Sequence, residues 1–128
     1  MSLPAAKAPV CFVLTANRAQ TKPFYADVLG LPVLGEDEHA VTFDIGNRTP
    51  MRLTDLPGHK PTGHTVLGWA VQDLRAAMRE LSTKGVKFHV FEGYGQDAEG
   101  VWQAPGGGAQ IAWFSDLEGN GLSLTQFG

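Results

Sequence analysis

Hydrophobic and polar positions follow one pattern twice along the chain. In each half an apolar stretch precedes a helix-like stretch that ends at a glycine. The apolar stretches are residues 10–15 and 66–71, and they predict strands buried on both faces. Residues 18–28 and 73–84 predict the helices, because Leu74, Met78 and Leu81 of the second recur at helical spacing.

The two halves are nearly in phase. Asn17 and Asp73 stand at the two junctions between strand and helix, where their side chains can cap the helix. Gly30 and Gly85 follow the helices after almost equal intervals, at the position where glycine turns left without steric cost. This spacing predicts a duplicated module with pseudo-twofold symmetry and a pocket where the halves meet. Pro23 predicts a shortened or kinked first helix.

Shorter apolar runs after each helix complete the pattern. The predicted strands are residues 31–34, 41–45, 50–54, 86–91, 109–114 and 121–126. The turn Gly46-Asn47-Arg48-Thr49 closes a hairpin in the first half, and the tight turn that closes the second half depends on Gly119 and Asn120. The order is therefore strand, helix and three strands, written twice. It predicts an α+β fold of two βαβββ modules, whose curved mixed sheet surrounds a cavity.

Length and composition predict one domain, 1–128, made of two modules (about 8–55 and 64–127). The net charge of −3 and the lack of a basic run argue against a nucleic-acid partner. No apolar run approaches the roughly 20 residues of a membrane span. The single cysteine, Cys11, cannot form an internal disulfide, which fits a reducing cytoplasm.

Several short motifs are spread over the chain. They are Phe24-Tyr25, Leu29-Gly30-Leu31, Asp73-Leu74, Gly85-Val86, Trp113-Phe114-Ser115-Asp116-Leu117-Glu118-Gly119-Asn120, Leu122 and Leu124. In combination they resemble the vicinal oxygen chelate superfamily, which holds glyoxalase I, bleomycin-resistance and extradiol dioxygenase proteins. His64-Thr65 and Ala112-Trp113-Phe114 are similar to a glyoxalase-like bacterial subgroup. The resemblance implies this fold, a small-molecule ligand and a homodimer.

Enzymes of that superfamily bind a divalent metal through one side chain at the start of each module and one on each module's last strand. The matching positions here are Val10, Val66, Arg52 and Ser123. Valine offers no lone pair and arginine is cationic, so we expect no metal and no cofactor. His64, two residues before Val66, is an alternative ligand, but no second His, Glu or Asp clearly joins it.

Arg52 and His64 are the polar candidates for a site. Arg52 could bind a carboxylate, phosphate or enolate oxygen, or it could be a rim arginine paired with Asp55 or Glu118. His64 could donate or carry a proton near neutral pH, or it could be an ordinary histidine of the polar connector 55–65.

Trp102 suits a flat wall for an aromatic ligand, whereas Trp69 and Trp113 could serve either there or in the core. His89 alternates with apolar neighbours and is expected on a solvated strand face. The predicted ligand-binding residues are Arg52, His64, Trp102, Ser123, Val10, Phe12 and Val66, the last three as apolar wall.

Three functions remain open from the sequence. The first is metal-independent sequestration of a small aromatic or anionic molecule, as in bleomycin-resistance proteins. The second is a metal-dependent lyase or dioxygenase of the superfamily. The third is a metal-free isomerase or lyase in which Arg52 holds an enolate and His64 acts as base.

Overall fold

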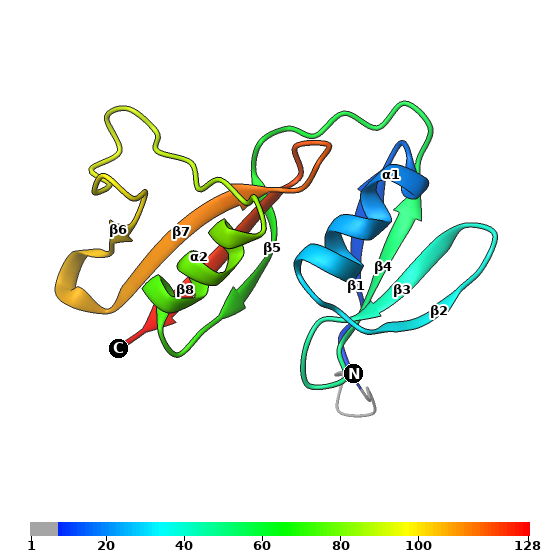
Figure 1. Cartoon of the computed structure of the whole chain (residues 1–128), viewed down its shortest axis with the longest axis horizontal. Coiled ribbons are helices and arrows are strands. Elements are labelled where there is room, and N and C mark those ends of the chain that lie inside the picture. The colour runs from blue at the N-terminus through cyan, green and yellow to red at the C-terminus, as the bar shows by residue number, and fades with distance from the viewer. Residues whose placement is uncertain (1–7) are drawn as a thin grey trace, which may run out of the picture. The chain divides into compact units, whose positions relative to one another are not determined.

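A computed structural model describes residues 8–128, so residues 1–7 of the predicted domain lie outside it. The chain divides into two compact units, an N-terminal unit that ends at Lys60 and a C-terminal unit, Pro61–Gly128. Each unit contains a strand, a helical segment and three further strands (Figure 1). The two sheets share one strand order, β1-β4-β3-β2 and β5-β8-β7-β6. The predicted α+β fold with a duplicated module is therefore confirmed, and the single domain stays a prediction.

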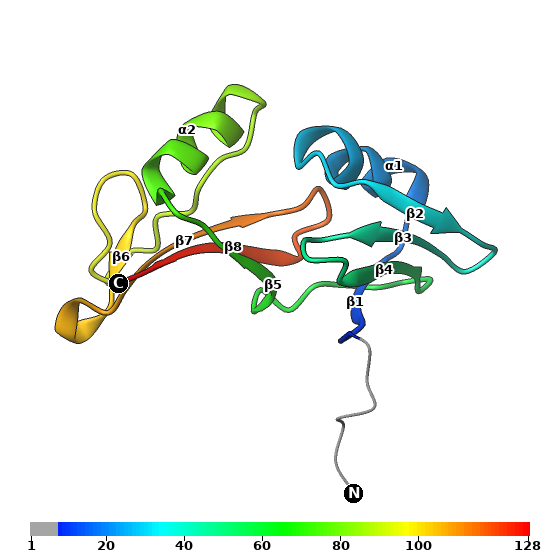
Figure 2. The ribbon, with the colours of Figure 1, turned by 90° about the horizontal axis from the view of Figure 1, so that it is seen from below.

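The N-terminal unit packs a helical segment on one face of its sheet (Figure 2). Its elements are β1 (Cys11–Thr15), α1 (Arg18–Pro23), the π turn η1 (Phe24–Val28), β2 (Val33–Glu36), β3 (Ala40–Asp44) and β4 (Pro50–Asp55). β1 and β4 are parallel, and the other pairs are antiparallel. Alternate residues of the strands form the buried face with the helical aromatics; they are Val13, Val41, Phe43, Met51, Leu53, Phe24 and Tyr25.

Pro23 stands where the α-helix gives way to a π turn. The Asn17 side chain caps the first turn by accepting from Gln20 N–H at 3.3 Å. Proline has no N–H to continue the α-helical ladder, and the α-helix ends at Pro23. One π turn follows, in which Leu29 N–H donates to Phe24 O at 2.9 Å. Gly30, at φ +70°, then turns the chain toward β2.

The C-terminal unit places its helix on one face of the sheet in the same way (Figures 1 and 2). Its elements are β5 (Thr65–Ala70), α2 (Leu74–Thr83), β6 (Trp102–Gln103), the short 3₁₀ turn η2 (Pro105–Gly107), β7 (Ala109–Ser115) and β8 (Gly121–Phe127). The core between helix and sheet contains Leu67, Leu74, Met78, Ala112, Phe114, Leu122 and Leu124. In the described part of the chain, neither helix is long and apolar enough to cross a bilayer.

Side chains close the ends of α2 and of the β7–β8 hairpin. Asp73 accepts from Ala76 N–H at 3.0 Å, and Gln126 of β8 accepts from Leu74 N–H at 2.8 Å. The predicted tight turn after β7 is confirmed. Asp116 Oδ1 accepts three backbone N–H groups there, and Asn120 Nδ2 donates to Asp116 Oδ2 at 2.7 Å.

The strand predicted over 86–91 is wrong. His89 N–H donates to Trp113 O of β7 at 2.8 Å, but the segment forms no ladder. Instead, the Gln96 side chain satisfies backbone groups that a strand would have paired. It accepts from Phe91 N–H at 2.6 Å and donates to His89 O at 2.9 Å and to Gly100 O at 2.7 Å. The strand beside β7 is β6, formed by only two residues.

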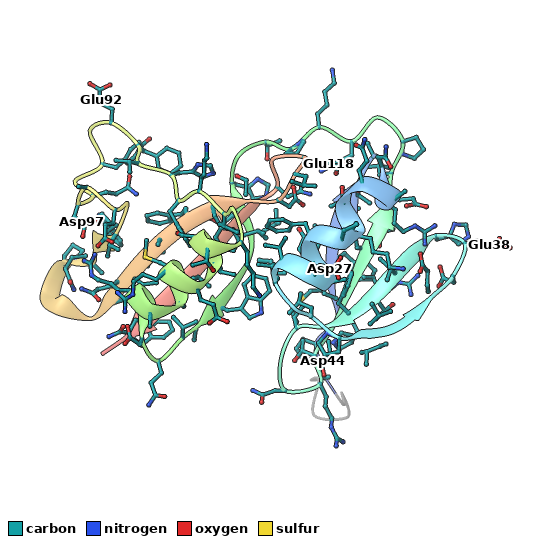
Figure 3. All side chains as sticks on the ribbon, viewed as in Figure 1. Asp27, Glu38, Asp44, Glu92, Asp97 and Glu118 are labelled. Atoms are coloured by element: carbon teal, nitrogen blue, oxygen red, sulfur yellow. The ribbon has the colours of Figure 1, made fainter. Side chains whose placement is uncertain are left out.

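Ion pairs hold the turn between β2 and β3 against the rest of the N-terminal unit. Arg18 pairs with Asp55 at 2.8 Å and donates to the backbone oxygens of Asp37 (2.8 Å) and Glu38 (3.2 Å). Glu38 stands at the outer end of this turn (Figure 3). The Asp37 carboxylate accepts from the backbone N–H groups of His39 and Ala40 and pairs with Arg52 at 3.1 Å.

The hairpin turn between β3 and β4 places Arg48 in a left-handed conformation that residues other than glycine disfavour. Thr49 N–H donates to Gly46 O at 2.9 Å, and the central residues Asn47 and Arg48 have φ values of 51° and 59°. A turn with two left-handed central positions matches the twist of a hairpin and favours Asn-Gly. Arginine there meets the steric cost that glycine avoids.

We expect Arg48→Gly to raise the free energy of unfolding by about 0.5–1 kcal/mol, since the left-handed position costs a non-glycine residue more than glycine loses in chain entropy. Urea denaturation measures the change. Arg48→Ala is the control, because it removes the same side chain and keeps the steric cost. A glycine variant no more stable than the alanine variant would contradict this account.

We expect the stability of the protein to fall between about pH 4 and pH 2 in part through Asp37. The backbone hydrogen bond from His39, with those from Arg52 and Ala40, lowers the pKa of Asp37 from 3.8 to about 2. A depressed folded pKa contributes stability above the unfolded pKa, which is lost as the pH falls through the folded value. Asp37→Asn should therefore flatten this part of an acid titration followed by circular dichroism. The control is Asp27→Asn, and parallel curves for wild type and Asp37→Asn would refute the role of this carboxylate.

Candidate functional site

The alternation of β7 separates two kinds of side chain. Ala112 and Phe114 are buried in the core against α2, so Trp113 and Ser115 face the other side of the sheet. Trp102 of β6 lies opposite Ile111, which shares the face of Trp113. The ring centroids of Trp102 and Trp113 are 6.3 Å apart. Trp69, by contrast, lies opposite the buried Leu124, on the face that α2 covers.

An aromatic cavity of about 450 Å³ opens on this face, within the C-terminal unit. It is lined by Gly63, Phe91, Tyr94, Trp102 and Trp113. Phe91 contacts Tyr94 edge to face with centroids 5.7 Å apart, and it contacts Trp113 at 6.4 Å. Phe91 is 44% exposed and Tyr94 is 68% exposed, so much of their ring surface faces open space. We call these four aromatic residues the aromatic wall.

The loop that carries Phe91 and Tyr94 is held from two sides. Gln96 binds the backbone at both ends of the loop, as described above. Arg75 of α2 pairs with Asp97 at 2.7 Å and with Glu99, and Asp97 accepts from Val101 N–H at 3.0 Å. The hydrogen bond from Arg75 is the main reason that the pKa of Asp97 lies below its ordinary value. Glu92, between the two aromatic residues in sequence, points away from the ribbon (Figure 3).

A second cavity, of about 280 Å³, adjoins the aromatic one. Both are lined by Gly63, Phe91 and Trp113, while the polar side chains of the second cavity are those of His64, Thr65, His89 and Ser115. His89 Nε2 lies 2.7 Å from Ser115 Oγ, and the His89 ring contacts Phe91 with centroids 5.6 Å apart. His89 is half-buried, so its expected place on a solvated strand face is wrong.

His64 and Trp102 line these two adjoining cavities. His64 is exposed, precedes β5 and hydrogen-bonds through Nδ1 to Thr62 Oγ1. The structure therefore places His64 beside candidate ligand space. The roles predicted for both residues stay predictions.

Ser123 is buried on β8, on the same sheet face as Trp113, its cross-strand partner. Its other partner is Gly68 of β5, where an added Cβ would overlap Ser123 Oγ. The absent side chain at Gly68 thus makes room for the serine hydroxyl. Val66, at the irregular start of β5, is 39% exposed.

Arg52 and Phe12 belong to the N-terminal unit, on adjacent strands and the same sheet face. Arg52 pairs with Asp37 at 3.1 Å and lies 3.4 Å from Thr42 Oγ1. Of the two partners predicted for a rim arginine, Asp55 pairs with Arg18 instead, and Glu118 stays a prediction. Phe12 is 60% exposed and Val10 is 50% exposed.

The residues at the superfamily's metal positions do not fit a metal. Val10 and Val66 have no donor atom, and the Arg52 guanidinium is cationic and paired with a carboxylate. Ser123 alone offers an oxygen. Across residues 8–128, no group of three or more His, Cys, Asp or Glu side chains is placed to hold an ion.

Sequence reasoning missed four residues of these cavities: Phe91, Tyr94, His89 and Ser115. Alternation with the apolar Phe114 could have placed Ser115 and Trp113 on one face. His89 and Phe91 lie on the segment predicted as a strand over 86–91, and Tyr94 follows it, where spacing predicts no orientation.

Comparison with known proteins agrees with this architecture. The family model described as Glyoxalase/Bleomycin resistance protein/Dioxygenase superfamily matches residues 8–124. A search of curated proteins finds no match.

Two solved structures illustrate the shared fold. One is TnmS3, an antibiotic binding protein from Streptomyces sp. CB03234, at 22% identity and a TM-score of 0.70, with 96% of this chain and 97% of that chain covered. The other is a superfamily member from Sphaerobacter thermophilus DSM 20745, at 24% identity and a TM-score of 0.71, with 94% and 97% covered. Because the family model spans nearly the whole chain, the protein belongs to the glyoxalase/bleomycin resistance protein/dioxygenase superfamily.

Proposed function

We propose that this protein binds and sequesters a small aromatic molecule without a metal. The observation that carries the proposal is the aromatic wall, four rings in a chain of mutual contacts around a cavity of about 450 Å³. Small-molecule sites are typically apolar clefts of about 300–1,000 Å³ with a few polar groups. The cavity has this size and this chemistry.

The energetic support comes from ring contacts. An aromatic pair contributes about 0.5–1.5 kcal/mol beyond the area it buries. A flat aromatic ligand that packs against several of these rings gains this free energy for each ring that it contacts. It also removes exposed ring surface of Phe91 and Tyr94 from water.

An aromatic ligand is favoured over an anionic one. The residues that line the aromatic cavity are uncharged. Arg52, the predicted anion anchor, is engaged by the Asp37 carboxylate at 3.1 Å. An incoming anion would have to compete with that pair.

The two enzyme alternatives have less support. A metal-dependent lyase or dioxygenase needs donor atoms at the family's ligand positions, where valine and arginine stand. A metal-free isomerase needs Arg52 for an enolate, and that guanidinium is already paired. TnmS3 is named an antibiotic binding protein, but at 22% identity the likeness shows only the fold. The homodimer and the cytoplasmic location stay predictions of the sequence.

We expect Trp102→Ala to weaken the binding of 2-methylnaphthalene at least tenfold, because the variant removes a whole indole from the wall of the cavity and with it the apolar area and ring contact that the ligand would gain. Equilibrium dialysis of the full chain measures the Kd. Trp69→Phe is the matched control, since Trp69 lies on the opposite face of the same sheet. Equal losses in both variants, or none in Trp102→Ala, would refute the assignment of the cavity.

We expect EDTA treatment to leave the Kd of 2-methylnaphthalene unchanged, since the aromatic wall needs no ion. Elemental analysis of the dialysed protein accompanies this measurement. About one equivalent of nickel, zinc, iron or manganese per chain, with binding lost in chelator, would favour the metal-dependent alternative instead.

A further inference from the structure

The aromatic wall leads into the adjoining cavity with a polar end. We infer that the His89–Ser115 pair binds a hydroxyl group carried by the aromatic ligand, so that the ligand class is a phenol or another hydroxylated aromatic molecule. This inference rests on the proposed function, because it assigns the polar half of the same site.

The geometry joins the two halves through β7. Trp113 and Ser115 are two residues apart on one strand and face the same way, about 7 Å apart along it. Phe91 and Trp113 line both cavities, and His89 and Ser115 line the second. A ring bound at Trp113 can therefore direct a substituent toward Ser115.

The pair is oriented before any ligand arrives. The backbone of His89 is held by its N–H bond to Trp113 O at 2.8 Å and by Gln96 Nε2, which donates to His89 O at 2.9 Å. Its ring packs against Phe91, and Nε2 lies 2.7 Å from Ser115 Oγ. Groups fixed by their own packing and hydrogen bonds lose little entropy on binding.

The chemistry of the pair selects a hydroxyl. A serine hydroxyl has one donor hydrogen and two acceptor lone pairs, and the bond to His89 uses one of these. If Ser115 donates to His89, it still accepts from a ligand. If His89 donates to Ser115, the serine hydrogen can turn to a ligand. A hydroxyl group serves both cases because it donates and accepts.

A ligand can reach the Ser115 hydroxyl because its neighbour on β8 is a glycine. The cross-strand partner of Ser115 is Gly121, which has no side chain to cover the serine. A Cβ at Gly121 would also come within 2.9 Å of the His64 carbonyl carbon, so the close approach of His64 keeps this position a glycine. Gly121 and Gly119 both line the same cavity.

The test compares two probes of similar shape, 2-naphthol and 2-methylnaphthalene, by equilibrium dialysis against the full chain. Ser115→Ala should weaken 2-naphthol about three- to tenfold, the range of one neutral hydrogen bond, and 2-methylnaphthalene less than about twofold. His89→Phe keeps a ring against Phe91 and should show the same selectivity. Thr125→Ala, on the same sheet face of β8, is the control and should change neither Kd.

Different results would overturn the hydroxyl site and the proposed function. Equal effects of Ser115→Ala on both probes, or no effect on either, would overturn the hydroxyl site while the aromatic wall stands. If the wild-type protein binds neither 2-naphthol nor 2-methylnaphthalene, the proposed function and the hydroxyl site are overturned together. If Ser115→Ala does not fold, His89→Phe carries the comparison with the same criteria.

Discussion

The two-residue period of β7 is the constraint on which the candidate site depends. One set of its side chains, Ala112 and Phe114, must lie in the core beneath α2, because buried apolar surface stabilises the unit. Burial of this set leaves Trp113 and Ser115 on the other face. A shift of one residue in register would bury a serine and a large indole and expose the core. The same hydrophobic requirement that stabilises the fold therefore also positions the side chains of the candidate site.

The two modules share one topology but present different side chains on the sheet face opposite the helix. In each unit the first and last strands are parallel and the helix crosses between strands. On the N-terminal unit's face opposite the helix, Arg52 lies between Phe12 and Thr42 and is neutralised by Asp37. On the matching face of the C-terminal unit lie Trp113 and Ser123. Duplication thus supplies two similar frames, and the side chains decide which of them forms an aromatic cavity.

Sequence reasoning predicted most of the frame and only part of the site. Helix caps at Asn17 and Asp73, the turn glycine Gly30 and the effect of Pro23 depend on interactions within a few residues, so the sequence shows them directly. The strand predicted over 86–91 is wrong because its pattern suits a strand, while the side chain of Gln96, five to seven residues further along, satisfies its backbone groups. Residue type alone pointed to Trp102, which lines the cavity, whereas Phe91 and Tyr94 lie on a loop whose orientation depends on the Gln96 bonds and on the ion pairs that Arg75 of α2 forms with Asp97 and Glu99.

The loop at residues 91–101 lies outside the strand ladder, and this has a consequence for how such proteins diverge. A substitution at Phe91 or Tyr94 alters a wall of the cavity and leaves the strand pairing in place. Its cost in stability is therefore small. Strand positions such as Phe114 have no such freedom. The lining of the cavity can therefore change while the scaffold persists, and structures at 22–24% identity keep the same fold.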